Sequence, residues 1–281
     1  MLIKDKSLEE SAVNIKKIEK NSQYNFNSIE DQFNFLKKEF HVIAGPCSVE
    51  NEKLLDITAK ELSKLGVKFL RGGLYKPRTS PYEFQGLKEN GLKLLKNTAQ
   101  KYGMMSVSEV TDTRLVESMS EYIDILQIGS RNMQNFELLK EVGRSKKSVL
   151  LKRGMSSTIE EFKYAAEYIA CEGNNNIIMC ERGIRTFETA TRNTLDISCA
   201  AILKNDTKIP VIIDVSHSLG RKDILKNISR AAVAVGADGI MIEVHCNPSK
   251  ALSDSFQQLN LNEFEHIFKD IKFFESLLHK L

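Results

Sequence analysis

A cluster of basic residues follows the apolar run at residues 67–70. Arg71 ends that run and two glycines follow it. Lys76 and Arg78 come a few residues later, with a proline between them and the hydroxyl of Thr79 beside them. Arginine forks pair bidentately with phosphate or carboxylate, while glycine and proline set the backbone more closely than a solvated loop requires. We therefore expect a site for a small, multiply anionic ligand.

Other cations also follow apolar runs that read as strands. The six strongest candidates are Arg71, Lys76, Arg78, Arg131, Lys152 and Arg182, and two looser ones are Arg185 and Arg221. Six cations in one place would repel one another unless anions joined them, as two phosphorylated metabolites would. For any single residue the alternative is a solvated charge, or an ion pair with a neighbour such as Glu181.

A second set of residues could bind a metal. Cys47, His217, Glu243 and Asp254 offer a thiolate, an imidazole and two carboxylates, which suit divalent Mn, Fe, Co or Zn without choosing among them. Their spacing along the chain matches no local metal-binding motif, so the four residues can form a metal site only if the fold brings them together. Taken singly, each could be a packed core or loop residue. His245, two residues beyond Glu243, is expected to be structural.

Composition excludes several other classes of protein. The 281 residues are 42% hydrophobic and 27% charged with a net charge of +3, which is ordinary globular composition and too weakly basic to indicate nucleic-acid binding. Five cysteines without a CxxC pair indicate free thiols and a cytoplasmic location. The start of the chain has no apolar signal core, and no apolar run is long enough to span a bilayer.

The elements that must position these residues alternate along the chain. Eight short apolar runs predict strands at His41–Ala44, Val67–Leu70, Met104–Val107, Ile123–Ile128, Val149–Leu151, Ile177–Met179, Val211–Ile213 and Gly239–Ile242. Helical patterns lie between and after them, at Glu52–Leu65, Leu87–Tyr102, Thr158–Glu172 (with Ser157 as its N-cap), Asp223–Val235 and Leu261–Leu278.

Eight such units predict an α/β fold, a (β/α)₈ barrel over residues 41–281. A doubly wound sheet would more typically carry a G-x-G-x-x-G turn after its first strand, which this chain lacks. In a barrel the site lies at the carboxyl ends of the strands, where both sets of residues fall. Residues 1–40 are polar and are expected to form a short arm on the barrel, with a helix starting near Ser7.

Several long motifs resemble the 3-deoxy-arabino-heptulosonate-7-phosphate (DAHP) synthases, in the type I subtype that is related to octulosonate-phosphate synthases. The motifs are Ala44-Gly45-Pro46-Cys47-Ser48, Leu70-Arg71-Gly72-Gly73, Lys76-Pro77-Arg78-Thr79-Ser80, Gln127-Ile128-Gly129-Ser130-Arg131-Asn132, Leu151-Lys152-Arg153-Gly154, Cys180-Glu181-Arg182-Gly183, Ser216-His217-Ser218, Glu243-Val244-His245 and Ala251-Leu252-Ser253-Asp254. They run in family order from about His41 almost to the end of the chain.

The resemblance implies a metal-dependent transferase that condenses phosphoenolpyruvate with erythrose 4-phosphate at the entry to the shikimate pathway. It implies Cys47, His217, Glu243 and Asp254 as metal ligands, with Cys47 and His217 at the reacting centre. Phosphoenolpyruvate would contact Arg71, Lys76, Arg131, Lys152 and Arg182. Erythrose 4-phosphate would contact Arg78 and Thr79, aided by Ser130 and Arg131. We expect Lys76 to be the proton donor, with its pKa lowered by neighbouring cations.

Three positions depart from the family pattern, and the changes at Ser255 and Cys246 are expected to affect the site. Val215 stands where proline or alanine usually precedes the Ser-His pair, and Ser255 replaces a glycine after Asp254, which puts the geometry of that loop in question. Cys246 replaces a proline and is expected to place a second thiol near the metal, where it would raise sensitivity to oxidation unless it is simply packed.

Two other functions fit the same residues. One is 3-deoxy-manno-octulosonate-8-phosphate synthase, which uses arabinose 5-phosphate. In that family the segment after the second strand is similar to Lys-Ala-Asn-Arg-Ser, whereas this chain has Lys76-Pro77-Arg78-Thr79-Ser80, which favours the four-carbon acceptor. The other is a barrel that binds phosphometabolites without turnover. No nucleic-acid or membrane partner is expected. The family resemblance implies a dimer or tetramer, and the short arm predicts weak or absent feedback inhibition.

Overall fold

The fold is described by a computed structural model that covers residues 39–78 and 80–278. The arm expected at residues 1–40, including the helix near Ser7, lies almost entirely outside the described residues. Eight strands alternate with helices along the rest of the chain. The strands are β1 (His41–Gly45), β2 (Phe69–Arg71), β3 (Met105–Val110), β4 (Ile125–Ile128), β5 (Ser148–Lys152), β6 (Ile177–Glu181), β7 (Val211–Asp214) and β8 (Gly239–Glu243).

These strands form one closed parallel barrel in chain order. β1 closes it by pairing with β2 on one side and β8 on the other, with Ala44 opposite Leu70 and Ile242. The predicted (β/α)₈ barrel is therefore confirmed, and each predicted strand overlaps an observed one. Most observed strands extend one to three residues further towards their carboxyl ends, which carries Arg71, Lys152 and Glu243 into the sheet.

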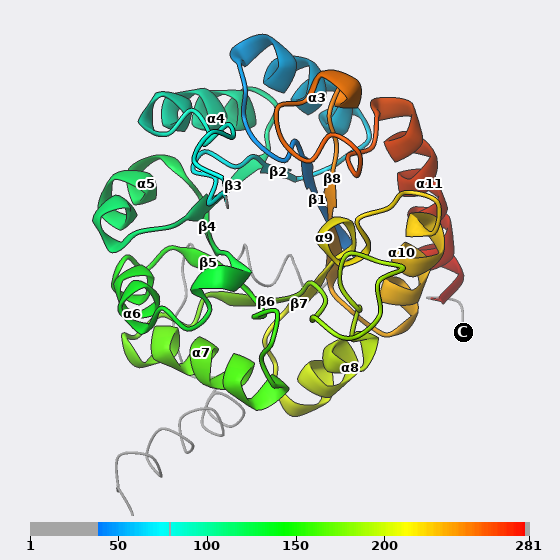
Figure 1. Ribbon diagram of the computed structural model, residues 1–281. Coiled ribbons are helices and arrows are strands. Elements are labelled where there is room, and N and C mark those ends of the chain that lie inside the picture. The colour runs from blue at the N-terminus through cyan, green and yellow to red at the C-terminus, as the bar shows by residue number, and fades with distance from the viewer. Residues whose placement is uncertain (1–38, 79, 279–281) are drawn as a thin grey trace, which may run out of the picture.

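The helices form an outer ring around the barrel, as Figure 1 shows in a view along the barrel axis. They are α3 (Glu52–Lys64), α4 (Glu89–Lys101), α5 (Val116–Tyr122), α6 (Phe136–Arg144), α7 (Ile159–Cys171), α8 (Ile197–Asp206), α9 (Val215–Leu219), α10 (Leu225–Ala234) and α11 (Leu261–Leu278), with 3₁₀ turns at Thr113–Leu115, Ser130–Asn132 and Pro248–Lys250. The short α9 lies nearer the centre, at the end of β7. Among these described helices, none is both long and apolar enough to cross a bilayer.

The predicted N-cap of α7 is wrong by one residue. Thr158, not Ser157, caps the helix: its side chain accepts from the backbone of Glu161, whose carboxylate accepts from the backbone of Thr158 in return. This reciprocal pair satisfies two amide groups at the helix start that would otherwise be unpaired. The hydroxyl of Ser157 donates to the carbonyl of Gly154 instead, 3.0 Å away, and shapes the preceding turn.

Candidate active site

The floor of the site follows from the two-residue repeat of β-strands. One layer of the barrel interior is filled by Ile43, Phe69, Val107, Ile125, Leu150, Cys180, Ile212 and Met241. Successive side chains on a strand point to opposite faces, so the next inward position is two residues on. Those positions hold Gly45, Arg71, Glu109, Gln127, Lys152, Arg182, Asp214 and Glu243. The change from apolar side chains to mostly charged or polar ones thus marks the top of the hydrophobic core.

Gly45 leaves room in this layer. Its φ is +148°, and a Cβ there would lie 2.1 Å from the carbonyl oxygen of Arg71. Any other residue would therefore push β2 away and displace the Arg71 side chain. In place of a side chain from β1, the loop after it brings the buried Cys47 to the edge of the layer.

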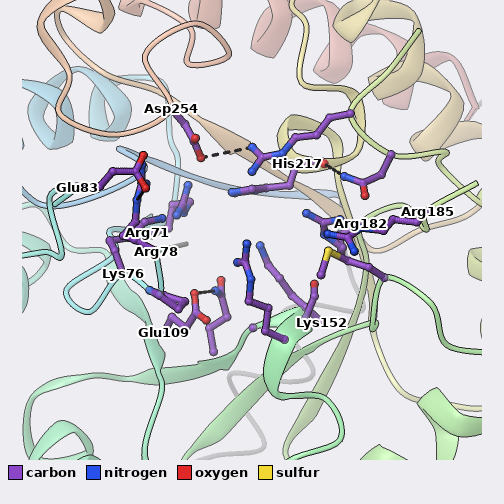
Figure 2. Close-up of a pocket in the computed structure, with 18 residues that line it drawn as sticks. Arg71, Lys76, Arg78, Glu83, Glu109, Lys152, Arg182, Arg185, His217 and Asp254 are labelled. Carbon is purple, nitrogen blue, oxygen red and sulfur yellow. Dashed lines mark hydrogen bonds and ion pairs between the residues drawn. The ribbon is translucent and has the colours of Figure 1, made fainter. Parts of the chain in front are cut away.

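A cavity of about 360 Å³ opens over the layer. All six strongest predicted cations line it, as do Ser130 and the looser candidate Arg185 (Figure 2). Arg221 does not line it, because its guanidinium pairs with Asp223 on the surface. Thr79 lies outside the described residues.

Acidic partners neutralise some of these cations. Arg71 donates to Glu243 at 2.6 Å, Lys152 to Asp214 at 2.5 Å, and Arg78 to Glu83 at 2.6 Å. Within residues 39–78 and 80–278, no ion pair joins Arg131 or Arg182 to a carboxylate. Burial, together with the nearby Arg192, lowers the pKa of Arg182. Binding of an anion to Arg131 and Arg182 would be favourable, because the anion would offset their desolvation and reduce the repulsion between neighbouring cations.

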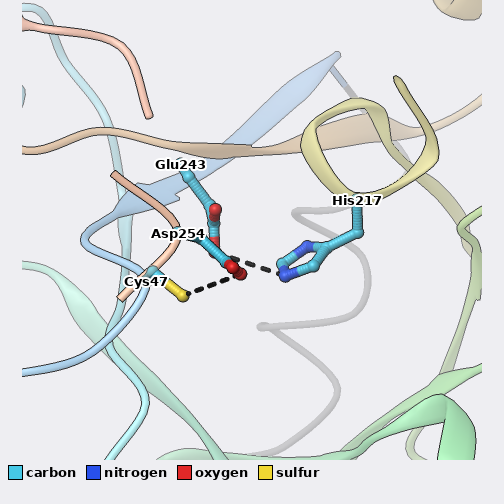
Figure 3. Close-up of side chains that lie close together, drawn as sticks. All are labelled: Cys47, His217, Glu243 and Asp254. Atoms are coloured by element: carbon cyan, nitrogen blue, oxygen red, sulfur yellow. Dashed lines mark hydrogen bonds and ion pairs between the residues drawn. The ribbon is translucent and has the colours of Figure 1, made fainter. Parts of the chain in front are cut away.

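The four predicted metal ligands converge beside this cavity. One donor atom from each of Cys47, His217, Glu243 and Asp254 lies within 4.8 Å of the other three (Figure 3). Cys47 Sγ is 3.4 Å from Asp254 Oδ2, and His217 Nε2 is 3.3 Å from Glu243 Oε1. This spacing and the mix of one sulfur, one nitrogen and two oxygens fit a single divalent transition ion.

Asp214 orients His217 towards the cluster. Its Oδ2 pairs with Nδ1 of the imidazole at 2.8 Å, and its Oδ1 accepts from the His217 backbone at 2.9 Å. Nε2 is left facing Glu243 and the cluster. Burial lowers the pKa of His217, which favours the neutral imidazole that binds metals. The partner role of Asp214 was not predicted, although its place beside His217 was visible in the sequence.

Glu243 is buried yet ionised. Burial opposes its charge, but His217, Arg71 and Lys76 outweigh that effect and hold the pKa of Glu243 well below its ordinary value. Cys47 shows the opposite balance. Burial, and then the charge of Glu243, raise the pKa of the Cys47 thiol to about 12. Without a bound cation, the cluster therefore holds a thiol and a carboxylate at neutral pH.

The prediction that the pKa of Lys76 is lowered is wrong. Burial does oppose its charge, but Cys47 and Glu243 outweigh burial and Arg71, so the pKa of Lys76 is raised. Its ammonium lies 3.1 Å from Cys47 Sγ. The sequence showed the neighbouring cations, whereas the anions that face Lys76 come from other strands.

The segment between β8 and α11 contains two of the three positions that depart from the family pattern, Ser255 and Cys246. The left-handed conformation falls on Asp254 itself, with φ +46°, so a glycine at position 255 is not what makes this turn. Cys246 is not a second thiol in the cluster. It is half-buried and its Sγ faces the carbonyl of Leu54 in α3 at 3.7 Å. His245 is buried outside the cluster as well.

Other lining residues were not predicted. Arg192 and Asn193 reach the cavity from the long segment between β6 and α8, and Met155 lies in the loop after β5. Arg192 donates to Asp254 at 3.4 Å and to Gln257 at 2.9 Å, and Asn193 donates to the carbonyl of His217 at 2.9 Å. No strand-end position marks these residues, so the sequence gives no signal for them.

The chain is similar in sequence to one enzyme family and to named bacterial enzymes. Residues 27–277 match the DAHP synthetase I family. A phospho-2-dehydro-3-deoxyheptonate aldolase from Thermotoga maritima is 56% identical over 233 residues, covering 83% of this chain and 69% of the relative. A 2-dehydro-3-deoxyphosphooctonate aldolase from Syntrophotalea carbinolica is 31% identical, covering 84% of this chain and 91% of the relative.

Solved structures agree with these matches. The crystal structure of the Thermotoga maritima DAHP synthase has a TM-score of 0.83 and 55% identity, covering 85% of this chain and 70% of that one. A truncated form of the 3-deoxy-D-arabino-heptulosonate 7-phosphate synthase from the same organism has a TM-score of 0.80 and 51% identity, covering 85% and 88%.

The protonation states of the cluster predict that binding of Mn²⁺ releases about one proton per chain at pH 7.5. Cys47 must lose its proton to bind, whereas Glu243 is already ionised and His217 already favours the neutral form. Apparent affinity should therefore rise about tenfold per pH unit near neutrality. Calorimetry in buffers of different ionisation enthalpy measures the release. Replacing the exposed Cys171 by alanine should not change it, and binding without proton release would contradict the assignment.

Proposed function

The chain belongs to the DAHP synthetase I family, and from this premise we propose how its residues carry out the reaction. The reaction joins phosphoenolpyruvate to erythrose 4-phosphate with addition of water, and gives DAHP and inorganic phosphate at the entry to the shikimate pathway. The observation that carries the residue assignment is the overlap of the two clusters. His217 and Asp254 line the same cavity as the cations that would bind the substrates.

Phosphoenolpyruvate would bind on the floor of the cavity. Arg131, Lys152 and Arg182 lie on consecutive barrel units and would grip its phosphate and carboxylate, with Arg71 and Lys76 completing the contact. The same groups would stabilise the charge that develops as phosphate leaves. Because they are held by the barrel, little reorganisation is needed when the anion arrives.

Erythrose 4-phosphate would bind nearer the rim. The Arg78 fork is now filled by Glu83, whose side chain is 45% exposed. Exposed ion pairs contribute little stability, so a phosphate could displace Glu83 at small cost. Thr79, Ser130 and Arg131 would share this phosphate. Holding it fixes the distance at which the aldehyde meets C3 of phosphoenolpyruvate.

A divalent ion would be held by Cys47, His217, Glu243 and Asp254. When bound, it supplies a Lewis acid for the acceptor aldehyde or the attacking water. The donor set does not choose among Mn, Fe, Co and Zn. Lys76 would give its proton to the new hydroxyl, since its raised pKa keeps it protonated at neutral pH.

The location and assembly are further proposals. All five cysteines lie in the described part of the chain and none forms a disulfide, which supports a cytoplasmic location. A dimer or tetramer is proposed from family resemblance. The octulosonate-phosphate relative compared above, at 31% identity, is more distant than the heptulosonate relative at 56%.

We expect phosphate release from phosphoenolpyruvate to be fast with erythrose 4-phosphate and at least about tenfold slower, in kcat/KM, with arabinose 5-phosphate. The reason is that the acceptor segment reads Lys76-Pro77-Arg78-Thr79-Ser80 and differs from the Lys-Ala-Asn-Arg-Ser of the five-carbon enzymes. Continuous assay of inorganic phosphate with Mn²⁺ measures both. A strong chelator should abolish activity and added Mn²⁺ restore it. A preference for the five-carbon sugar would contradict the acceptor assignment.

Replacing Arg78 by methionine should raise KM for erythrose 4-phosphate by about 10–100-fold, since hydrogen bonds to a charged group contribute about 1.5–3 kcal/mol each. KM for phosphoenolpyruvate should hardly change, because that substrate binds deeper. Steady-state kinetics with each substrate varied in turn gives the split. Arg114→Met, at an exposed arginine outside the cavity, is the matched control. An equal rise in both KM values would contradict the assignment.

A further inference from the structure

Two adjacent glutamines lie buried behind the four-residue cluster. Gln257 and Gln258 follow Asp254 in the loop that leads to α11, and each is only 1% exposed. Buried carboxamides are costly unless their donors and acceptors are paired. Both side chains are paired at both ends, and each has one partner in the metal site described above.

Gln257 joins Glu243 to Arg192. Its Nε2 donates to Glu243 Oε2 at 2.6 Å, and its Oε1 accepts from Arg192 Nη1 at 2.9 Å. The reverse orientation would set oxygen against a carboxylate and NH₂ against a guanidinium, so the chemistry of the partners fixes the amide. Oε2 of Glu243 therefore points to Gln257, away from the cluster. Oε1 accepts from Arg71 Nη1 at 2.6 Å and also lies 3.3 Å from His217 Nε2, so it is the oxygen directed to the cluster.

Gln258 joins Cys47 to the Asp254 loop. Its Oε1 accepts from the Cys47 backbone at 2.9 Å, and its Nε2 donates to the carbonyl of Ser253 at 2.7 Å. The partners again allow only this orientation. The same side chain therefore holds the backbone of one cluster residue and the residue preceding another.

Arg192 extends the connection across the mouth of the barrel. Besides Gln257, it donates to Asp254 Oδ2 at 3.4 Å. The two glutamines and Arg192 thus touch Cys47, Glu243 and Asp254 or their immediate neighbours. His217 is held separately, by Asp214 and Asn193.

We propose that Gln257 and Gln258 are positioning residues that set the geometry of the bound metal, with Gln257 restricting Glu243 to one coordinating oxygen. This inference rests on the metal site of the proposed function. Without Gln257, both oxygens of Glu243 could turn towards the ion. Without Gln258, Cys47 and the Asp254 loop would no longer be held at a fixed separation. Partners of metal ligands typically change affinity by about 10–100-fold when they are removed.

The test is Co²⁺ binding to metal-free protein, in competition with a chelator of known affinity. Gln257→Met and Gln258→Met keep the side-chain length and remove the hydrogen bonds. Each should bind Co²⁺ about 10–100-fold more weakly, and Gln257→Met should also alter the visible absorption bands that report coordination geometry. Gln100→Met, at an exposed position on α4, is the matched control and should behave as wild type.

Thermal unfolding of the metal-free proteins, on the same samples, shows that each variant is folded. Should a methionine variant fail to fold, Gln257→Asn and Gln258→Asn take its place, because the shorter amide cannot span both partners. Wild-type affinity and spectrum in a folded variant would overturn the inference while leaving the metal site intact. Absence of saturable Co²⁺ binding to the wild type would overturn the site itself, and the inference with it.

Discussion

The closed parallel barrel imposes one constraint on which the site depends: every second side chain of a strand must point into a shared interior. Below the mouth these positions are apolar and pack together. Two residues later, seven of the eight strand paths carry a charged or polar group, and all meet in one layer. Residues as far apart as Arg71 and Glu243 thereby come within 2.6 Å. No local motif could achieve this.

Charges buried at such density must compensate one another, because isolated ions are strongly disfavoured away from water. Glu243 is paired with Arg71, and Asp214 with Lys152. Asp214 also forms a hydrogen bond with the His217 ring. Arg131 and Arg182 have no carboxylate partner within the described residues. The site therefore has two chemically different regions. The cluster around Cys47 gathers four metal-binding side chains, and the surface around Arg131 and Arg182 gathers cations that no carboxylate of the described residues pairs with. A divalent ion beside phosphorylated substrates would match both.

The sequence predicted the features that depend on the alternation of strands with helices and on the residue types at the carboxyl ends of the strands. The eight strands, Arg71 and Lys152 at their ends, and the convergence of Cys47 with His217 all follow from alternation and barrel closure. What it could not reveal depends on loops and on three-dimensional neighbours. Arg192 and Gln257 sit in irregular segments with no period. The direction of the Lys76 pKa shift depends on anions from other strands, and the contact of Cys246 with α3 depends on where the chain turns after β8.

We infer that one metal ion binds among Cys47, His217, Glu243 and Asp254. X-ray absorption spectroscopy of the Zn²⁺-loaded protein measures the ligands directly. We expect one sulfur neighbour at about 2.3 Å and nitrogen or oxygen neighbours at about 2.0–2.2 Å, with the sulfur lost in Cys47→Ser. A shell of nitrogen and oxygen alone in the wild-type protein would contradict it.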